Sequence, residues 1–393
     1  MRDDAVLLAG VECPSAEPWA PFAPLALDFL EALSAALRKE HGGREELAAF
    51  GFWCRRPHLE ALAKRHESPL PRLGRGLLFH VAPSNVPAMF AYSFAIGLLA
   101  GNANMVRLST RRGEIEARLC AVLGKVLDLP RFAPVKARSS FLSYERDDSL
   151  TAGYLSQCDG RVIWGGDAAV EAVERLPMPP HGVTVSFPDR WSLALLDQKA
   201  LSGLSPSELA ALAHRFYNDT YLMDQNACSS PQLVVWLADG GENPVRRRWW
   251  EALAAEAGER YPMGPFQAAR KYERFCACAM TGPAAVLERY GGNLVYVSRL
   301  AARPAAPMEW KGGFGLFFET EVQSLEQLLP LLSPKTQTLV CGGVDPGETA
   351  AFLASRHARG VSRVVPVGQA LEMDTIWDGR DMIAQLSRII SHT

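Results

Sequence analysis

The sequence predicts an α/β fold in two domains, and three observations support this. First, 393 residues exceed what one ordinary hydrophobic core organises. Second, a continuous apolar strand at 76–82 opens a series of alternating strands and helices that runs to about residue 196. Third, a similar alternation resumes after residue 228, with no low-complexity linker or internal repeat in between. Such alternation predicts doubly wound parallel sheets, ligands at the carboxyl ends of their strands, and a broad cleft between the domains.

Composition and charge narrow the class of protein. Apolar residues make up 48 % and charged residues 21 % of the chain, as in a folded globular protein. The net charge of −2 predicts no binding to nucleic acid, and the longest apolar stretch, 88–100, is shorter than the roughly 20 residues that span a bilayer. Eight cysteines without a disulfide-framework spacing, and no secretory signal, favour free thiols in the cytoplasm. Cys276 and Cys278 lack a second pair or a histidine cluster, so we expect no metal site.

The expected elements follow in chain order. Residues 1–70 read as a mainly helical segment that packs on the first domain, with helices at 24–41 and 58–66. The first α/β domain, 71–204, has expected elements at 76–82, 88–100, 104–108, 114–127, 140–144, 149–157, 161–164, 168–176, 183–187 and 193–196. The second domain, 205–365, has expected helices at 205–221, 245–280, 325–332 and 348–357 and strands at 232–236, 294–298, 314–320 and 338–341. A tail, 366–393, closes with a helix at 382–390 and either returns to the first domain or forms an oligomer interface.

One cysteine stands out by its position. Cys228 lies between the expected helix 205–221 and the β-rich run QLVVW, in the segment QNACSSP. Small and polar residues suit a tight connection there, and Pro231 cannot continue a helix. A thiol at such a junction can face a cleft while rigid elements hold it from both sides. The alternative is a small buried hydrophobe, as most cysteines of a globular chain are.

Two further features follow expected strands of the first domain. Asn85 stands in the segment PSNVP, where its amide can donate hydrogen bonds in a fixed direction, although asparagine is also a good helix cap. Gly165 and Gly166 follow strand 161–164 and open a helix, so that phosphate groups could approach the backbone there. The alternative for the glycine pair is an ordinary tight turn.

A basic residue ends the strand at 104–108. Arg107 is followed by the hydroxyl side chains of Ser109 and Thr110. A positive charge with hydroxyls and no carboxylate suits a ribose 2′-phosphate better than a free 2′-hydroxyl. The alternative is a solvent-facing arginine.

Together these segments resemble the aldehyde dehydrogenase superfamily and, more closely, its acyl-CoA or long-chain acyl-protein thioester reductases of the LuxC type. The resemblance rests on HVAPSNVP (80–87), GLLAGNANMVRLST (97–110), WGGDAAVEAV (164–173), SFPDRWSLALLD (186–197), DQNACSSPQLVVW (224–236), RVVPVGQALEM and IWDG. It covers the chain from about residue 74 to its end, in the family's order. It implies a Rossmann-type cofactor domain and an α/β catalytic domain.

The resemblance also implies roles for residues at matching positions. Cys228 falls at the nucleophile of a G-Q-x-C motif, and Asn85 falls at the asparagine of P-W-N-x-P, which helps to hold the substrate oxyanion. Arg107 falls where a lysine usually contacts the cofactor ribose, and Thr110 falls where NAD-preferring members often carry a glutamate, so the resemblance favours NADPH. The residues expected to bind the cofactor are Pro83, Ser84, Arg107, Ser109, Thr110, Trp164, Gly165 and Gly166.

The chain departs from the superfamily pattern at two places. Ser186 stands where hydrolytic aldehyde dehydrogenases have the glutamate that activates water, so an acyl-cysteine should react slowly with water but can still exchange with a thiol. For the glutamate that positions the nicotinamide ribose, Glu309 and Glu319 are both candidates, and neither is assigned.

The resemblance therefore implies NADPH-dependent reduction of an acyl thioester, from acyl-CoA or an acyl-protein, to the aldehyde through a covalent acyl-cysteine. We expect a cytoplasmic homo-oligomer, with an acyl-protein synthetase as a candidate partner. Two alternatives stay open: an acyl-phosphate reductase of the glutamyl phosphate type, and a non-catalytic acyl-binding partner in a biosynthetic complex. The joint presence of Cys228 and Asn85 argues against the second.

Overall fold

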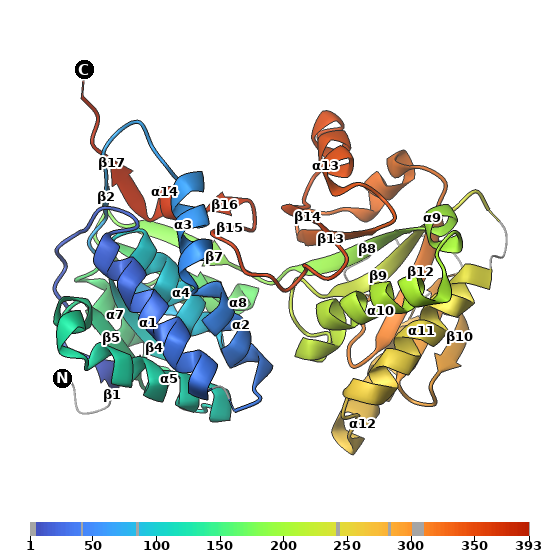
Figure 1. Ribbon diagram of the computed structural model, residues 1–393, viewed down its shortest axis with the longest axis horizontal. Coiled ribbons are helices and arrows are strands. Elements are labelled where there is room, and N and C mark those ends of the chain that lie inside the picture. Colours follow the sequence, from blue (N-terminus) through green and yellow to red (C-terminus); the bar gives the residue numbers. More distant parts are fainter. Residues whose placement is uncertain are drawn as a thin grey trace. The chain divides into compact units, whose positions relative to one another are not determined.

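The structure, a computed structural model, describes residues 5–40, 42–83, 86–240, 244–281, 284–300 and 310–392. The chain forms two compact units (Figure 1). Unit 1 consists of Met1–Pro188 and Met373–Thr393, and unit 2 consists of Asp189–Glu372. Each unit has its own, mainly parallel sheet.

The sheet of unit 1 is doubly wound. Its strands are β1 (Val6–Gly10), β3 (Leu77–Val81), β4 (Ala103–Leu108), β5 (Ser139–Ser143), β6 (Gly160–Trp164) and β7 (Val183–Phe187). Their order is β1-β5-β4-β3-β6-β7, and neighbours run parallel except β1 and β5. The chain runs outward from β3 through β4 to β5 and then returns to β6 on the other side of β3. A switch point, where such sheets bind ligands, therefore lies between β3 and β6.

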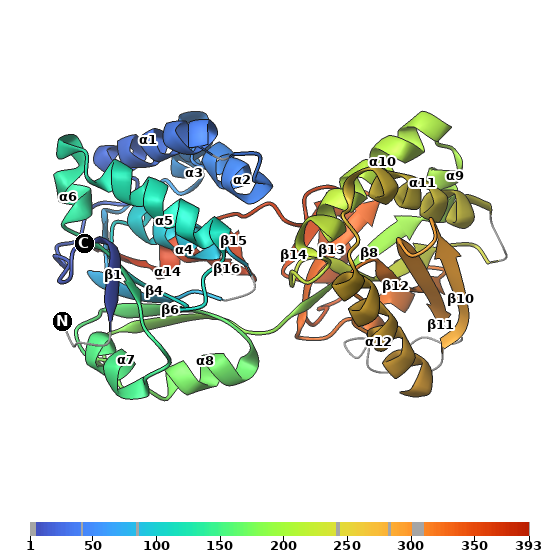
Figure 2. The ribbon, with the colours of Figure 1, turned by 90° about the horizontal axis from the view of Figure 1, so that it is seen from below.

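Helices cover both faces of this sheet (Figure 2). They are α1 (Pro24–Glu40), α2 (Glu45–Trp53), α3 (Arg56–Arg65), α4 (Met89–Leu99), α5 (Glu114–Leu127), α6 (Ala133–Lys136), α7 (Asp148–Leu155) and α8 (Asp167–Glu174), with a 3₁₀ turn η1 (Pro130–Phe132). One core joins α1, α4 and α5 to Leu78 and Val106, and the opposite core joins α7 and α8 to Phe79 and Met105. Neighbouring residues of a strand thus serve different cores, as a period of two requires.

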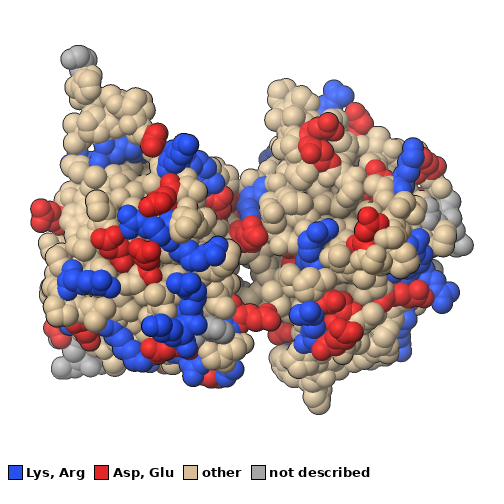
Figure 3. Space-filling view, in the orientation of Figure 1, with Lys and Arg blue, Asp and Glu red and all other residues tan. Residues whose placement is uncertain are grey.

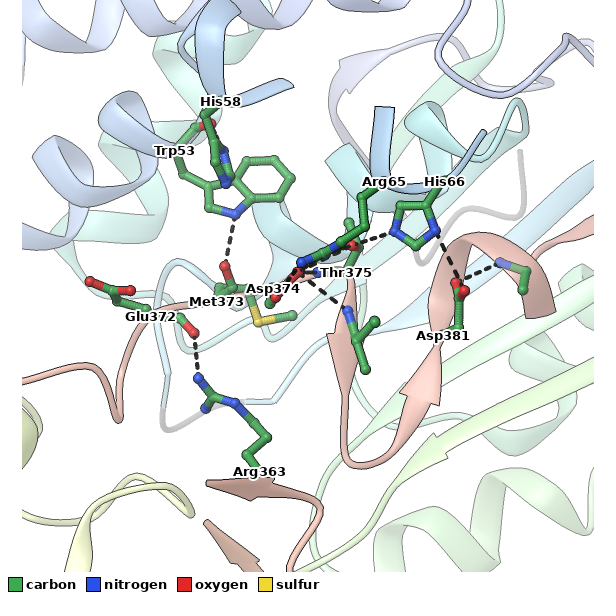
Figure 4. Close-up of polar contacts among 12 residues, drawn as sticks. Trp53, His58, Arg65, His66, Arg363, Glu372, Met373, Asp374, Thr375 and Asp381 are labelled. Atoms are coloured by element: carbon green, nitrogen blue, oxygen red, sulfur yellow. Dashed lines mark hydrogen bonds and ion pairs between the residues drawn. The ribbon is translucent and has the colours of Figure 1, made fainter. Parts of the chain in front are cut away.

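The tail closes unit 1 (Figure 4). Trp53 donates its indole N–H to the Met373 carbonyl at 2.9 Å, and the Arg65 guanidinium pairs with Asp374 at 3.0 Å. His66 contacts the Thr375 hydroxyl at 2.8 Å. The tail continues through a small hairpin, β15 (Ile376–Trp377) and β16 (Arg380–Asp381), and α14 (Met382–Gln385) to β17 (Ser387–Ile389).

The expected closing helix at 382–390 is wrong beyond Gln385. β17 instead pairs antiparallel with the short strand β2 (Arg72–Gly74), which the sequence did not indicate. Likewise, β1 was not expected within the mainly helical segment 1–70. β1 is an edge strand of the unit 1 sheet, and β2 and β17 form a separate two-stranded sheet, so each of these short strands depends on a partner that is distant in the chain.

The sheet of unit 2 has the order β10-β11-β12-β9-β8-β13-β14, with all neighbours parallel except β10 and β11. Its strands are β8 (Trp191–Asp197), β9 (Pro231–Leu237), β10 (Ala284–Tyr290), β11 (Val295–Leu300), β12 (Leu316–Val322), β13 (Thr336–Gly342) and β14 (Arg363–Pro366). The units divide at 188/189 rather than at the expected 204/205, because β8 pairs with β9 and β13.

The helices of unit 2 are α9 (Gln198–Ser202), α10 (Pro206–Thr220), α11 (Pro244–Arg260), α12 (Pro265–Thr281) and α13 (Pro346–Ser355), with the 3₁₀ segments η2 (Tyr221–Met223) and η4 (Leu325–Leu331). The single helical region expected at 245–280 is two helices, because Pro262 and Gly264 interrupt it. In the described part of the chain, no helix is long and apolar enough to cross a membrane. Acidic and basic side chains are interspersed on the face shown in Figure 3, in keeping with the small net charge.

Candidate active site

Cys228 lies in a tight turn immediately before β9, at the amino edge of the unit 2 sheet. The Ser230 N–H donates to the Ala227 carbonyl at 3.0 Å and closes the turn. The Cys228 thiol is partly exposed. In unit 2 it is therefore the loop entering a strand, and not the carboxyl edge, that presents the candidate nucleophile.

Burial separates Cys228 from four of the seven other cysteines. It raises the pKa of the Cys54 thiol well above its ordinary value, the pKa of Cys120 and of Cys158 to about 12, and the pKa of Cys341 to about 11. Such thiols stay protonated and unreactive near neutral pH. Cys228 is one of four cysteines that are at least partly exposed.

Gln225 holds the entry to the Cys228 turn. Its backbone is left-handed (φ 58°), and its side chain is buried. The side-chain N–H donates to the Pro231 carbonyl at 3.0 Å, and the side-chain oxygen accepts the Gly315 N–H at 3.1 Å. A left-handed non-glycine residue costs about 1–2 kcal/mol, and two hydrogen bonds of about 1 kcal/mol each offset this. The cysteine turn is thereby tied to the start of β9 and to the loop before β12.

Two more contacts fix the same turn from unit 2 helices. The Asp224 carboxylate accepts the Tyr261 hydroxyl at 2.5 Å, just after α11. Arg274 of α12 donates to the Asn226 side-chain oxygen at 3.2 Å and to the Gly312 carbonyl. Burial lowers the pKa of Arg274, but a guanidinium stays cationic at neutral pH, so the contact of Arg274 with Asn226 is charge-assisted.

Ser192 of β8 supports the turn from behind. Its buried hydroxyl donates to the Cys228 carbonyl at 2.7 Å and accepts the Thr338 N–H at 3.1 Å. The register of β8 and β13 shifts at this point, and the Ser192 hydroxyl gives the Thr338 N–H the hydrogen-bond acceptor that the irregular ladder does not supply. The cysteine backbone is thus fixed on both sides, which gives its side chain a defined direction.

The other half of the expected site lies in unit 1. Asn85 and Ser84 fall outside the described residues, whereas Pro83 is described and lies two residues after the end of β3. Gly165 and Gly166 follow β6, so they lie with Pro83 at the carboxyl edge beside the switch point. Gly166 caps α8, and a Cβ placed there would meet nothing within 4 Å. The open space at this helix N-terminus fits a phosphate-bearing cofactor.

The side chain of Trp164 has a different role from the one expected. It is 6 % exposed, stacks on Phe187 with ring centroids 3.8 Å apart, and donates its N–H to the Ser93 hydroxyl at 3.0 Å. The ring therefore belongs to the interior of unit 1, and only the backbone of Trp164 remains for the expected cofactor contact.

Arg107 and Ser109 lie at the carboxyl end of β4. The Arg107 guanidinium lies over the Tyr144 ring at 4.8 Å and donates to the Tyr144 carbonyl at 3.3 Å. Its Nε is buried, and no described residue accepts a hydrogen bond from it, so this donor is left for another group. The Ser109 hydroxyl accepts the Arg111 N–H at 3.1 Å.

Thr110 corrects one expectation. Its hydroxyl donates to the Glu145 carboxylate at 2.6 Å. The sequence around Arg107 indicated hydroxyls and no carboxylate, but the neighbouring strand β5 brings Glu145 to the same edge of the sheet. Nothing in the linear sequence near Thr110 marks this residue.

Comparisons of the sequence with known proteins show its family. A model of the acyl-CoA reductase (LuxC) family matches residues 49–273, more than half of the chain. The chain belongs to the LuxC family. The long-chain acyl-protein thioester reductase of Aliivibrio fischeri is 24 % identical over 331 residues, which cover 81 % of this chain and 64 % of the relative. That of Vibrio harveyi is 29 % identical over 168 residues, covering 42 % of this chain and 33 % of the relative. The chain thus spans less than two thirds of these curated relatives.

Solved structures show that this LuxC-family chain has the aldehyde dehydrogenase fold. Lactaldehyde dehydrogenase from Escherichia coli superposes with a TM-score of 0.66 at 14 % identity, covering 93 % of this chain and 86 % of that one. A salicylaldehyde dehydrogenase from Pseudomonas putida G7 gives 0.63 at 11 % identity, covering 94 % and 85 %. The expected fold class and the family resemblance are both confirmed.

The structure of this LuxC-family chain describes one of the two candidates for the glutamate that positions the nicotinamide ribose. Glu309 lies outside the described residues. Glu319 is buried in β12, where its carboxylate accepts the indole N–H groups of Trp236 at 2.9 Å and Trp250 at 3.0 Å and pairs with Arg299 at 3.1 Å. These contacts give Glu319 a structural role in the core of unit 2.

Ser186 stands where the resemblance implies the loss of the water-activating glutamate, and the structure brings a carboxylate of α8 to it. The Ser186 hydroxyl, nearly buried in β7, donates to Glu174 at the end of α8. Among the described residues, no group of three or more His, Cys, Asp or Glu side chains is arranged to hold a metal ion.

Proposed function

We propose that this chain reduces an acyl thioester, from acyl-CoA or an acyl-protein, to the aldehyde with NADPH through a covalent adduct on Cys228. The observation that carries the proposal is a partly exposed thiol whose turn is fixed by Gln225 and Ser192, in a chain of the acyl-CoA reductase (LuxC) family. Because the turn is already fixed, the thiol can attack a bound carbonyl carbon without a further loss of conformational entropy.

The first step is acyl transfer. The Cys228 thiolate forms a bond to the thioester carbonyl carbon, the bond from that carbon to the donor sulfur breaks, and the donor leaves as a thiolate that takes up a proton. We assign the oxyanion contacts to the Asn85 side chain and the Cys228 N–H, each donor being worth on the order of 10²–10³ in rate. Arg274 holds the Asn226 side chain, two residues before Cys228 in the turn.

The second step releases the aldehyde. A nicotinamide cofactor held by the unit 1 residues named below would supply the hydride that the acyl carbon takes up. The carbon–sulfur bond to Cys228 then breaks, and the thiolate is restored. The Ser186 hydroxyl is not itself a base for water, and the Glu174 carboxylate beside it already accepts the Ser186 hydrogen bond, so we expect the adduct to persist until hydride or thiol reaches it.

Unit 1 supplies the proposed cofactor contacts. Pro83, Gly165 and Gly166 lie beside the switch point, where the backbone and the N-terminus of α8 suit the phosphates. Arg107 and Ser109 lie at the end of β4, where the buried Nε of Arg107 suits the ribose 2′-phosphate. Ser84, Thr110 and the backbone of Trp164 complete the proposed set. We further propose a cytoplasmic homo-oligomer that draws its acyl group from CoA or from an acyl-protein synthetase.

The nucleophile is tested by mass spectrometry after exposure to a panel of acyl-CoAs. We expect an acyl mass on the peptide that contains Cys228, no such mass in Cys228→Ala, and aldehyde formation at least about a thousandfold slower in that variant. Cys276→Ala, which removes another partly exposed thiol, is the control and keeps both signals. Aldehyde formation by Cys228→Ala at the normal rate would refute the assignment, and acylation by acyl phosphates but not by acyl-CoAs would refute the thioester.

A further inference from the structure

Glu145 reaches the end of β4 from the neighbouring strand. β4 and β5 are paired as far as Leu108 and Ser143, and Thr110 and Glu145 each lie two residues beyond that pair. There the Thr110 hydroxyl donates to the Glu145 carboxylate at 2.6 Å. The contact places a negative charge at the edge of the sheet at which an acidic side chain of a doubly wound fold binds a ribose 2′-hydroxyl.

Basic side chains surround the same edge. Arg107 is anchored on Tyr144, the residue just before Glu145. Arg112 donates to the Ser143 hydroxyl and to the Ser109 carbonyl. The edge therefore presents guanidinium groups, which favour a phosphate, and one carboxylate, which opposes it.

We infer that Glu145 is a specificity-determining residue that lowers the preference for a 2′-phosphorylated cofactor, so that this chain binds NADH as well as NADPH. The inference rests on the proposed function. The Glu145 carboxylate can accept a hydrogen bond from a 2′-hydroxyl and repels a 2′-phosphate, whereas Arg107 does the reverse. Glu145 and Arg107 lie at the ends of adjacent strands. Glu145 favours NADH over NADPH, and Arg107 favours NADPH over NADH.

The size of the effect follows from charge. Repulsion between a carboxylate and a nearly doubly charged phosphate a few ångströms away in water changes affinity by about tenfold, or about 1.4 kcal/mol. We therefore expect the wild-type protein to bind NADPH and NADH with dissociation constants within about tenfold of each other. Glu145→Gln keeps the size of the side chain and removes its charge, and it should raise the preference for NADPH about tenfold.

The test is calorimetric titration of NADPH and NADH into the full chain without acyl substrate, for wild type, Glu145→Gln and Arg107→Ala. Asp148→Asn is the matched control, because it removes an exposed carboxylate three residues further along the chain, which pairs with Arg146 at 3.6 Å. The control should leave the ratio of the NADH dissociation constant to the NADPH dissociation constant unchanged. Arg107→Ala should lower this ratio.

The outcomes separate this inference from the proposed function. An unchanged ratio in Glu145→Gln, or an equal change in Asp148→Asn, would overturn the role of Glu145 while cofactor binding itself persists. A wild-type preference for NADPH of a hundredfold or more would also overturn it. Failure of the wild-type protein to bind either cofactor would instead refute the proposed function.

Discussion

At the scale of single residues, Gln225 adopts a backbone conformation that its residue type disfavours. The resemblance places a glycine at this position of the G-Q-x-C motif, and the left-handed φ of 58° shows the geometric need for one. Here a glutamine takes the same conformation, and its buried side chain adds two hydrogen bonds that a glycine could not make. The side-chain hydrogen bonds of Gln225 anchor the Cys228 turn and offset the strain of its left-handed backbone.

The left-handed backbone at Gln225 predicts a difference in stability between two substitutions. Gln225→Ala keeps the left-handed strain and leaves the Gly315 N–H and the Pro231 carbonyl without their partner, so it should lower the free energy of unfolding by about 2–4 kcal/mol. Gln225→Gly loses the same hydrogen bonds but not the strain, and it should be more stable than the alanine variant by about 1 kcal/mol. Urea unfolding measures both. Equal stability of the two variants would contradict the role of the left-handed backbone.

At the scale of elements, a buried polar network joins β3, β4, α4 and β6. His80 contacts the Ser93 hydroxyl at 2.7 Å and Asn104 at 3.0 Å, and Trp164 donates to the same hydroxyl. Burial lowers the pKa of His80 to about 4. The network therefore fits a neutral imidazole whose Nε2–H donates to the Asn104 oxygen and whose Nδ1 accepts from Ser93.

The network predicts how unit 1 responds to acid. Unfolded His80 binds a proton near pH 6.5 and folded His80 only near pH 4, so the unfolded state gains protons first as the pH falls. Stability should be fully present above about pH 6.5 and decline towards pH 4, by on the order of 3 kcal/mol. Urea unfolding followed by tryptophan fluorescence at several pH values tests this. His80→Gln should flatten the decline, and the exposed His181→Gln should leave it unchanged.

At the scale of the whole molecule, the last residues of the chain belong to the unit that contains the first. Met373, Trp377, Met382, Ile383 and Leu386 are part of the same core as α1, α4 and α5. The Arg65, His66 and Trp53 contacts hold the start of this tail on α2 and α3 (Figure 4). Unit 1 is therefore built from two segments of the chain, with unit 2 between them in the sequence.

A core substitution in the tail should accordingly destabilise unit 1. Ile383→Ala removes a side chain that is 2 % exposed and should cost about 2–4 kcal/mol. Hydrogen exchange should then accelerate in β3, β4 and α1, measured by mass spectrometry. Ile390→Ala is the control, because that side chain is 42 % exposed and its loss should be nearly neutral. Equal acceleration in both variants, or none in either, would contradict the inclusion of the tail in this core.

The sequence by itself determined the fold class, the family and most buried strands. Apolar runs such as 76–82 and 161–164 are visible because a strand covered on both faces is apolar throughout, and motif order needs no coordinates. It also singled out Cys228 and Arg107. Only the tertiary structure decided what depends on residues distant in the chain: the short strands β1, β2 and β17, the interior role of Trp164, and the support of Cys228 by Ser192. Glu145 belongs to the same group, because strand pairing, and not sequence separation, brings a carboxylate to Thr110.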